Sequence, residues 1–102
     1  METRKDSWLP PLKPSEISES RLIRAILDGT FPINSNLPAE RDLAGLLGVT
    51  RPTLREAMQR LARDGWLDIQ HGKPTRVRDF WKEGGLGVTI ALAQYQYPIR
   101  LP

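Results

Sequence analysis

The sequence predicts a mainly helical domain (α+β) that contains three helices and one small two-stranded β-hairpin. Apolar residues recur at helical spacing in three successive segments, and a glycine follows each segment. The stretch after the third segment alternates apolar and polar residues and then contains a turn sequence, which is typical of a hairpin. We therefore expect helices over 15–28, 39–47 and 51–64, and the hairpin over 66–78.

The first helix has clear end signals. Ser15 is the expected N-cap, and Glu16 and Glu19 stand in the first turn, where the helix dipole favours negative charge. Gly29 is the expected stop. The inward stripe is expected to contain Leu22, Ile23, Ile26 and Leu27.

The second and third helices are separated by a short turn. Gly48 permits the left-handed backbone that ends a helix, and Thr50 is placed to cap the next one. Pro52 falls in the first turn of the third helix, where its missing N–H costs little. The residues expected to face inward from this region are Leu43, Leu46, Leu47, Val49, Leu54, Met58 and Leu61.

In the hairpin, Leu67, Ile69 and Val77 are expected to point inward. The turn is expected over 71–74. Trp66 and Trp81 have the size and position of core residues.

Both ends of the chain differ from the middle. Residues 1–14 contain three prolines and little apolar periodicity, which predicts a flexible N-terminal tail. The domain proper is expected over 15–81. Gly84, Gly85 and Gly87 predict a joint within 82–102, and 88–95 has the composition to begin a further helix.

Composition excludes several classes of function. The chain has 102 residues, enough for one small domain, and no cysteine, so disulfides, thiolate metal sites and cysteine nucleophiles are excluded. It has a single histidine and no glycine-rich phosphate loop, so we expect no enzyme, no cofactor and no metal. No apolar run is long enough to span a bilayer and no secretory signal is present, so a cytoplasmic protein is expected.

Positive charge is concentrated in one part of the chain. Residues 50–78 carry seven Lys or Arg and three Asp or Glu, a net charge of +4, whereas the whole chain has +3. Such a basic stripe is the electrostatic footprint of a polyanion-binding surface. A solvated helix face is the alternative reading of an isolated basic helix.

The spacing of three residues decides between these readings. A helix-turn-helix needs a small residue where its helices cross, a glycine in the turn and an apolar residue that packs between the helices. Ala44, Gly48 and Leu54 meet these needs, and the hairpin that follows makes the whole a winged helix-turn-helix. The sequence therefore predicts that the chain binds double-stranded DNA.

The candidate contacts come from three places. The start of the third helix would enter the major groove, where Arg51 can pair with guanine O6 and N7. Arg41 would reach the DNA backbone or a base edge, although an ion pair with Glu40 or Asp42 is equally compatible with the sequence. The wing tip would contact the narrow minor groove. The full candidate set is Arg41, Thr50, Arg51, Pro52, Thr53, Arg55, His71, Gly72 and Lys73.

For Arg60 and Arg63, further along the third helix, a solvated position or a pair with Glu56 or Asp64 is expected instead.

The motif LPAERDLAGLLGVTRPTLREAMQRLARDGWL, over 37–67, resembles the N-terminal domain of the GntR family of bacterial transcription regulators. The continuation IQHGKPT, followed by FW and GL, is similar to members of that family that respond to fatty acids. The resemblance covers 15–92 and implies a regulator of fatty-acid metabolism that acts in the bacterial nucleoid. Its positions match all nine candidate contacts except Pro52, where the fatty-acid-responsive members are expected to have threonine.

The resemblance also implies what this chain lacks. Such regulators have a second, all-helical domain that binds acyl-CoA and forms most of the dimer, so 82–102 is expected to be a linker and the truncated start of that domain. Acyl-CoA binding is therefore expected only in a full-length relative. Homodimerisation on a palindromic operator is expected to be weakened.

One alternative belongs to another functional class. A winged helix can serve protein–protein contact without specific DNA binding, and weak, salt-insensitive DNA binding would favour that reading.

Overall fold

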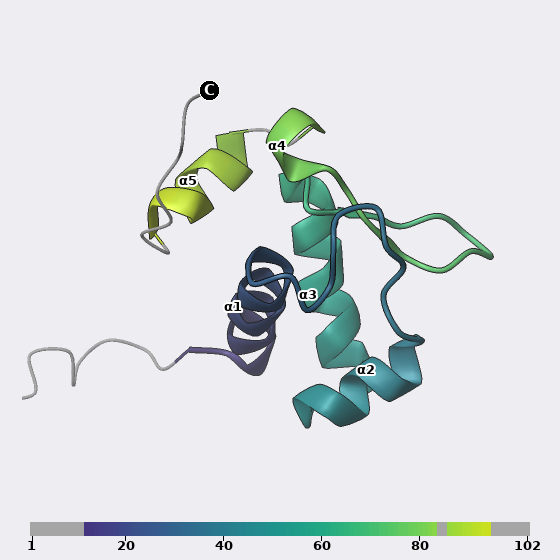
Figure 1. Cartoon of the computed structure of the whole chain (residues 1–102). Helices are drawn as coiled ribbons and strands as arrows, with labels where there is room; N and C mark the ends of the chain where they lie inside the picture. The colour runs from purple at the N-terminus through teal and green to yellow at the C-terminus, as the bar shows by residue number, and fades with distance from the viewer. Residues whose placement is uncertain (1–11, 84–85, 95–102) are drawn as a thin grey trace, which may run out of the picture.

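The computed structural model describes residues 12–83 and 86–94. Figure 1 shows α1 packed beside α3, α2 near one end of α3, and a hairpin projecting from the other elements. The predicted fold class, mainly helical with a two-stranded antiparallel hairpin, is confirmed within these residues. The elements are α1 (Pro14–Leu27), α2 (Glu40–Leu47), α3 (Arg51–Asp64), β1 (Leu67–Asp68), β2 (Arg76–Val77), α4 (Phe80–Glu83) and α5 (Leu86–Gln94).

Helix α1 begins one residue before the expected position. Lys13 occupies the N-cap. The backbone N–H of Lys13 donates a hydrogen bond to the Glu16 carboxylate at 2.8 Å. The expectation of Ser15 as N-cap is therefore wrong. Pro14 fits the first helical position because its φ is already helical and no partner is needed for a missing N–H. Ser15 consequently lies inside the first turn and is buried.

The hydrophobic core lies where α1, α3 and the hairpin meet. It consists of Leu22, Ile23, Ile26, Leu37, Leu43, Ala44, Leu54, Met58, Leu61, Trp66, Leu67, Val77, Phe80, Val88 and Leu92. An ion pair at the edge of this core joins Glu19 of α1 to Arg60 of α3 at 3.3 Å. Burial raises the pKa of the Glu19 carboxyl despite the nearby guanidinium, so its surroundings as a whole disfavour the ionised carboxylate.

Leu46 on α2 was expected to face inward, and this expectation is wrong because its side chain is 68% exposed. At 100° per residue, Ala44 and Leu47 lie to one side of Leu43 on the helix surface, whereas Leu46 lies 60° to the other side. α2 packs on the domain through the side that carries Ala44 and Leu47, and the side that carries Leu46 faces solvent. Val49, expected to be buried, is half-buried against the core.

The turn between α2 and α3 has the predicted chemistry. Gly48 has φ +70°, and the N–H of Val49 donates to the carbonyl of Ala44 at 3.1 Å, which closes the end of α2. Thr50 caps α3, because its hydroxyl accepts a hydrogen bond from the backbone N–H of Thr53 at 3.3 Å. The backbone conformation thus sets where α3 begins.

Gly48→Val should lower the free energy of unfolding by about 1–2 kcal/mol, because a side chain at positive φ is strained. A Cβ at Gly48 would meet nothing within 4 Å, so the whole cost is in the backbone. Gly45→Val is the matched control, since Gly45 also has open space around it but lies inside α2. Thermal melts followed by circular dichroism should show a loss for Gly48→Val alone, and equal losses would rule out backbone strain as the cause.

Hydrogen bonds from a third segment hold the wing in addition to the pairing of its own two strands. β1 and β2 pair antiparallel, with Leu67 opposite Val77. The loop over 34–37 lies along the other side of β2: the Asn34 N–H donates to the Val77 carbonyl at 2.7 Å, and the Leu37 N–H donates to the Thr75 carbonyl at 2.8 Å. β2 is therefore held from both sides.

Two details of the predicted wing are wrong. Ile69 is 43% exposed rather than inward, because the paired ladder ends at Asp68 and the alternation of sides ends with it. The turn closes one residue earlier than expected, with the N–H of Lys73 donating to the carbonyl of Gln70 at 3.2 Å. Gly72, at φ +75°, supplies the left-handed residue inside this turn.

Trp66 is completely buried, as predicted, but Trp81 is 52% exposed, so its assignment to the core is wrong. Phe80 occupies the space beside Trp66, with ring centroids 5.1 Å apart, and Trp81 lies on the outer side of Phe80. Helix α5 adds Val88 and Leu92 to the same core, which therefore continues past the predicted domain end at Trp81.

Several expectations concern the ends of the chain. Most of the predicted N-terminal tail, residues 1–11, lies outside the described residues, as do Gly84 and Gly85. Gly87, expected in a joint, lies within α5. The assignment of 82–102 to a linker before a further domain stays a prediction. No described helix has the length and hydropathy to cross a membrane.

Candidate nucleic-acid interface

The residues proposed to read DNA gather at the N-terminal end of α3. Thr50, Arg51, Pro52 and Arg55 are exposed, and Thr53 is half-buried. The hydroxyls of Thr50 and Thr53 lie 3.0 Å apart, which ties the first turn to its cap. The structure thus places one continuous set of cationic and hydroxyl groups at the exposed helix start.

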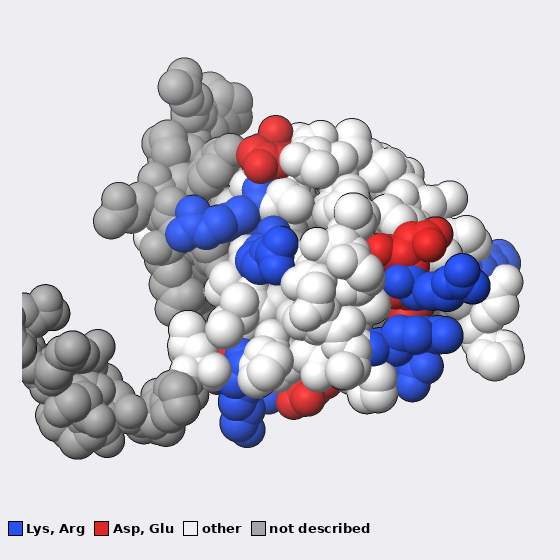
Figure 2. All heavy atoms as spheres, turned by 90° about the horizontal axis from the view of Figure 1, so that it is seen from below, with Lys and Arg blue, Asp and Glu red and all other residues white. Residues whose placement is uncertain are grey.

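Glu40, at the first position of α2, binds both arginines of this set. Its Oε1 accepts from Arg51 Nε at 2.9 Å and lies 2.8 Å from Arg51 Nη2. Its Oε2 accepts from Arg55 Nε at 2.9 Å. Seen from below, Figure 2 shows Lys and Arg atoms in several separate areas of the surface, and in the area on the right Asp and Glu atoms lie directly beside them.

The ion cluster changes the electrostatics of the surface. Hydrogen bonds from Arg55 and then Arg51 hold the pKa of the Glu40 carboxyl below its ordinary value. In turn the hydrogen bond and charge of Glu40 raise the pKa of Arg55. The Glu40 carboxyl is therefore ionised at neutral pH, and with its two arginine partners the cluster carries two formal positive charges and one negative charge.

The sequence did not predict this cluster. Glu40 was considered as a partner of the adjacent Arg41, whereas its actual partners are 11 and 15 residues away. The available signal was the pair Arg51 and Arg55 at i and i+4, which share one helix face and can meet a single carboxylate.

Arg41 is exposed, and its side chain makes no hydrogen bond or ion pair with any residue in 12–83 or 86–94. The alternative pairs with Glu40 and Asp42 are therefore not formed. Arg41 remains available at the same end of α2 as the cluster.

The wing tip lies across a groove from α3. His71, Gly72 and Lys73 are all exposed. The groove has a volume of about 530 Å³, and Lys73 on one wall faces a lining that includes Arg55 and Glu40. Arg55 of α3 and Lys73 of the wing thus line one concave surface, whereas Arg51, His71 and Gly72 are not part of its lining.

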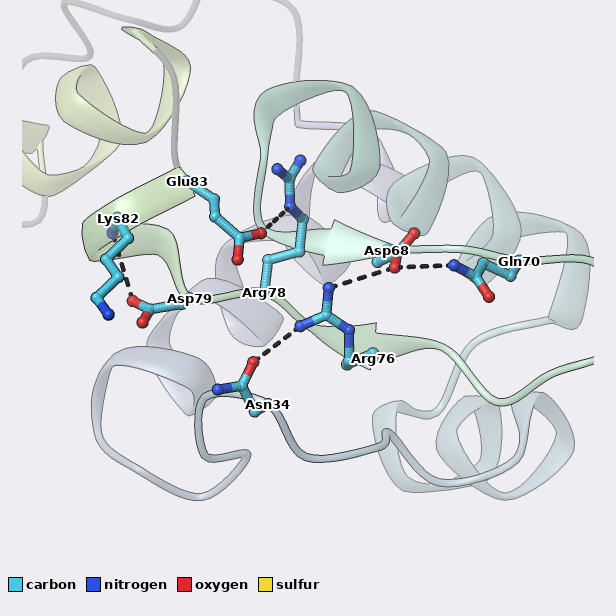
Figure 3. Close-up of polar contacts among 8 residues, drawn as sticks. All are labelled: Asn34, Asp68, Gln70, Arg76, Arg78, Asp79, Lys82 and Glu83. Carbon is cyan, nitrogen blue, oxygen red and sulfur yellow. Dashed lines mark hydrogen bonds and ion pairs between the residues drawn. The ribbon is translucent and has the colours of Figure 1, made fainter.

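At the base of the wing, Arg76 joins three elements (Figure 3). Its Nη1 donates to Asn34 Oδ1 at 2.8 Å, and its Nη2 donates to Asp68 Oδ2 at 3.3 Å. Gln70 Nε2 donates to the same Asp68 oxygen at 3.2 Å. These contacts connect the loop before α2 to both strands, so they position the wing relative to the groove.

Not every basic residue of the 50–78 segment belongs to the candidate interface. Arg78 pairs with Glu83 at 3.0 Å, and Arg76 is occupied as described above. Arg60 pairs with Glu56, as predicted, and also with Glu19. Arg63 is exposed in the last turn of α3. Fewer basic side chains are therefore available to the candidate interface than the seven Lys and Arg residues of the 50–78 segment.

The model of the family described as "Bacterial regulatory proteins, gntR family" matches residues 16–77. The chain belongs to this family. Among curated proteins, it is 58% identical over 80 residues to the "Fatty acid metabolism regulator protein" of Shewanella baltica, a match that covers 78% of this chain and 34% of the relative. The chain thus spans about a third of the length of such relatives.

Solved structures agree with the fold. A Streptococcus agalactiae GntR is similar with a TM-score of 0.62 and 30% identity, over 78% of this chain and 38% of that one. AraR(DBD) in complex with operator ORX1 is similar with a TM-score of 0.61 and 23% identity, over 76% of this chain and 90% of that one. The second likeness concerns the fold alone. The winged helix-turn-helix prediction is confirmed.

Proposed function

We propose that this chain is the sequence-specific DNA-binding part of a transcription regulator of fatty-acid metabolism. The observation that carries the proposal is the exposed start of α3, where Glu40 binds both Arg51 and Arg55, and Arg55 lines one groove together with Lys73 of the wing. Family membership and the name of the curated relatives support it. The solved structure of AraR(DBD) in complex with operator ORX1 shows a protein of the same fold together with an operator.

Each candidate residue has a role that fits its position. The N-terminal end of α3 enters the major groove of the DNA. There Arg51 reads guanine, and Thr53 contacts a phosphate or a thymine methyl. Thr50, Pro52 and Arg55 line the same entry. Arg41, unpaired among the described residues, contacts the DNA backbone or a base edge.

The wing supplies a second contact. His71 and Lys73 approach the minor groove, whose narrow A·T-rich stretches attract positive charge. Gly72 lets the backbone come close to the sugar-phosphate wall because it has no side chain.

Two chains would read the two halves of a palindromic operator. A homodimer contact would add affinity by making the second binding event intramolecular. As a bacterial regulator, the chain would act in the cytoplasm, at the nucleoid.

Selection from a pool of random duplexes tests the proposal. The purified chain should enrich a common sequence, and fluorescence anisotropy should then show preference for that duplex over a scrambled one of equal composition. The logarithm of the binding constant should fall linearly with that of salt concentration. Enrichment of no sequence, with weak binding that is insensitive to salt, would favour a protein-interaction module instead.

Lys73→Ala should weaken binding to the selected and scrambled duplexes by similar factors and reduce the salt slope by about 1, because it removes one phosphate contact. Lys82→Ala is the matched control, since Lys82 is also exposed but lies on α4 beside Asp79 and is not part of the groove lining. The measurement is anisotropy at several salt concentrations. An unchanged slope for Lys73→Ala would exclude that lysine from the phosphate contacts.

A further inference from the structure

Glu40 is an acidic residue between two arginines of a surface proposed to bind a polyanion. We propose that Glu40 is a positioning residue for base reading, which orients Arg51 and Arg55 and, by its charge, weakens binding to DNA of arbitrary sequence. The inference rests on the proposed function and adds a determinant of specificity to it.

The geometry shows which part of Arg51 is engaged. Both contacts to Glu40 Oε1, at 2.9 and 2.8 Å, come from the side edge formed by Nε and Nη2. The end edge, formed by Nη1 and the second N–H of Nη2, has no acceptor among the described residues. An arginine pairs with guanine O6 and N7 through two parallel N–H groups, and this end edge offers two. Glu40 thus holds the guanidinium without using the edge that would read the base.

Arg55 is held through Nε alone, by the other oxygen of the same carboxylate at 2.9 Å. One rigid group therefore relates the orientations of two arginines that are one helical turn apart. Without it, each side chain, more than half exposed, would sample many rotamers. Ordering those rotamers on binding would then oppose association.

Burial distinguishes Glu40 from an incidental surface partner. Its side chain is 28% exposed, whereas those of Arg51 and Arg55 are 53% and 54% exposed. The Glu40 side chain is therefore less accessible to solvent than the side chains of the two arginines that it binds.

The charge has a separate consequence. Glu40 reduces the formal charge of the cluster from +2 to +1. Contacts to phosphates depend on charge and not on sequence, so a carboxylate here weakens nonspecific binding. The charge weakens binding to every sequence by a similar factor, whereas orientation strengthens only the correct contact, so orientation is the effect that increases the preference for one sequence.

The test compares Glu40→Gln with Asp42→Asn. Both variants remove one negative charge from the first turn of α2, but the Asp42 side chain has no hydrogen bond or ion pair with any residue of the described ranges. Anisotropy is measured with the duplex selected by the wild-type chain and with its scrambled counterpart, across a salt series. Melting temperatures establish that both variants fold.

For Glu40→Gln we expect tighter binding to the scrambled duplex, weaker binding to the selected one and a preference reduced about tenfold, within the range for loss of one bidentate base contact. Asp42→Asn should tighten binding to both duplexes by similar factors and leave the preference unchanged. A double-mutant cycle completes the test: in an Arg51→Ala background, most of the effect of Glu40→Gln on preference should vanish.

Three results would overturn the inference. An unchanged preference in Glu40→Gln would mean that Glu40 does not position the arginines, while the proposed function would stand. Equal effects of the two variants would leave only a charge effect. Absence of any preference in the wild-type chain would overturn the proposed function itself, and the inference with it.

Discussion

Leu54→Ala should lower the free energy of unfolding by about 2–5 kcal/mol, the largest effect that we expect from one substitution. Leu54 is completely buried in the core, one turn after the exposed start of α3. Truncation removes three heavy atoms of apolar side chain and leaves a cavity that packed neighbours fill only in part. Small domains have a free energy of unfolding of roughly 5–15 kcal/mol, so this substitution should remove a large fraction of the stability of the domain.

Urea denaturation followed by circular dichroism measures this effect. Leu46→Ala is the matched control, because it makes the same substitution at a position that is 68% exposed on α2. It should change stability by no more than about 0.5 kcal/mol. Equal losses in the two variants would contradict the assignment of Leu54 to the core and Leu46 to the surface.

Arg51→Ala should weaken binding to the selected duplex by about 1–3 kcal/mol and relax the preference at one base pair, because it removes a bidentate contact with guanine. Binding to scrambled DNA should change much less. Stability should change little, since the pair with Glu40 is exposed and such pairs contribute little to folding.

Arg63→Ala is the matched control for this prediction, since Arg63 is an exposed arginine in the last turn of the same helix. It should leave base preference unchanged. Competition with duplexes altered at single base pairs identifies the position that Arg51 reads. If Arg51→Ala weakens all duplexes equally, the arginine contacts phosphate and reads no base.

The helix boundaries of the central region were accessible from sequence because their signals are local. Gly48 and Thr50 each act within a few residues, through positive φ and through an N-cap hydrogen bond. The same holds for Gly65, whose left-handed backbone ends α3. Three other boundaries differed by one residue: α1 begins and ends one residue earlier than predicted, with Lys13 instead of Ser15 as its N-cap, and α2 begins one residue later.

Three side chains that the sequence predicts to be buried are exposed in the structure, because the sequence does not show how much of each face another element covers. Periodicity places Leu46, Ile69 and Trp81 near the correct faces but does not say where the covering element ends. α2 buries a narrow stripe, the β ladder stops at Asp68, and Phe80 takes the place beside Trp66. All three side chains are therefore exposed.

Contacts between distant segments were missed for a related reason. The Asn34–Leu37 loop has little strand propensity, and its pairing with β2 depends on where the hairpin lies. Glu40 meets Arg51 and Arg55 only because the helices cross at the turn around Gly48. The candidate contact residues themselves follow from the helix-turn-helix pattern, and their roles in binding stay predictions.

The most direct test of the central claim is to map the DNA-binding surface by NMR. Adding the selected duplex to ¹⁵N-labelled protein should shift the backbone amides of Arg51, Thr53 and Arg55 in α3, together with those of Gly72 and Lys73 at the wing tip. The amide of Arg63 should be unaffected. Shifts confined to other surfaces, such as the face of α2 around Leu46, would contradict the claim that the start of α3 and the wing tip read DNA.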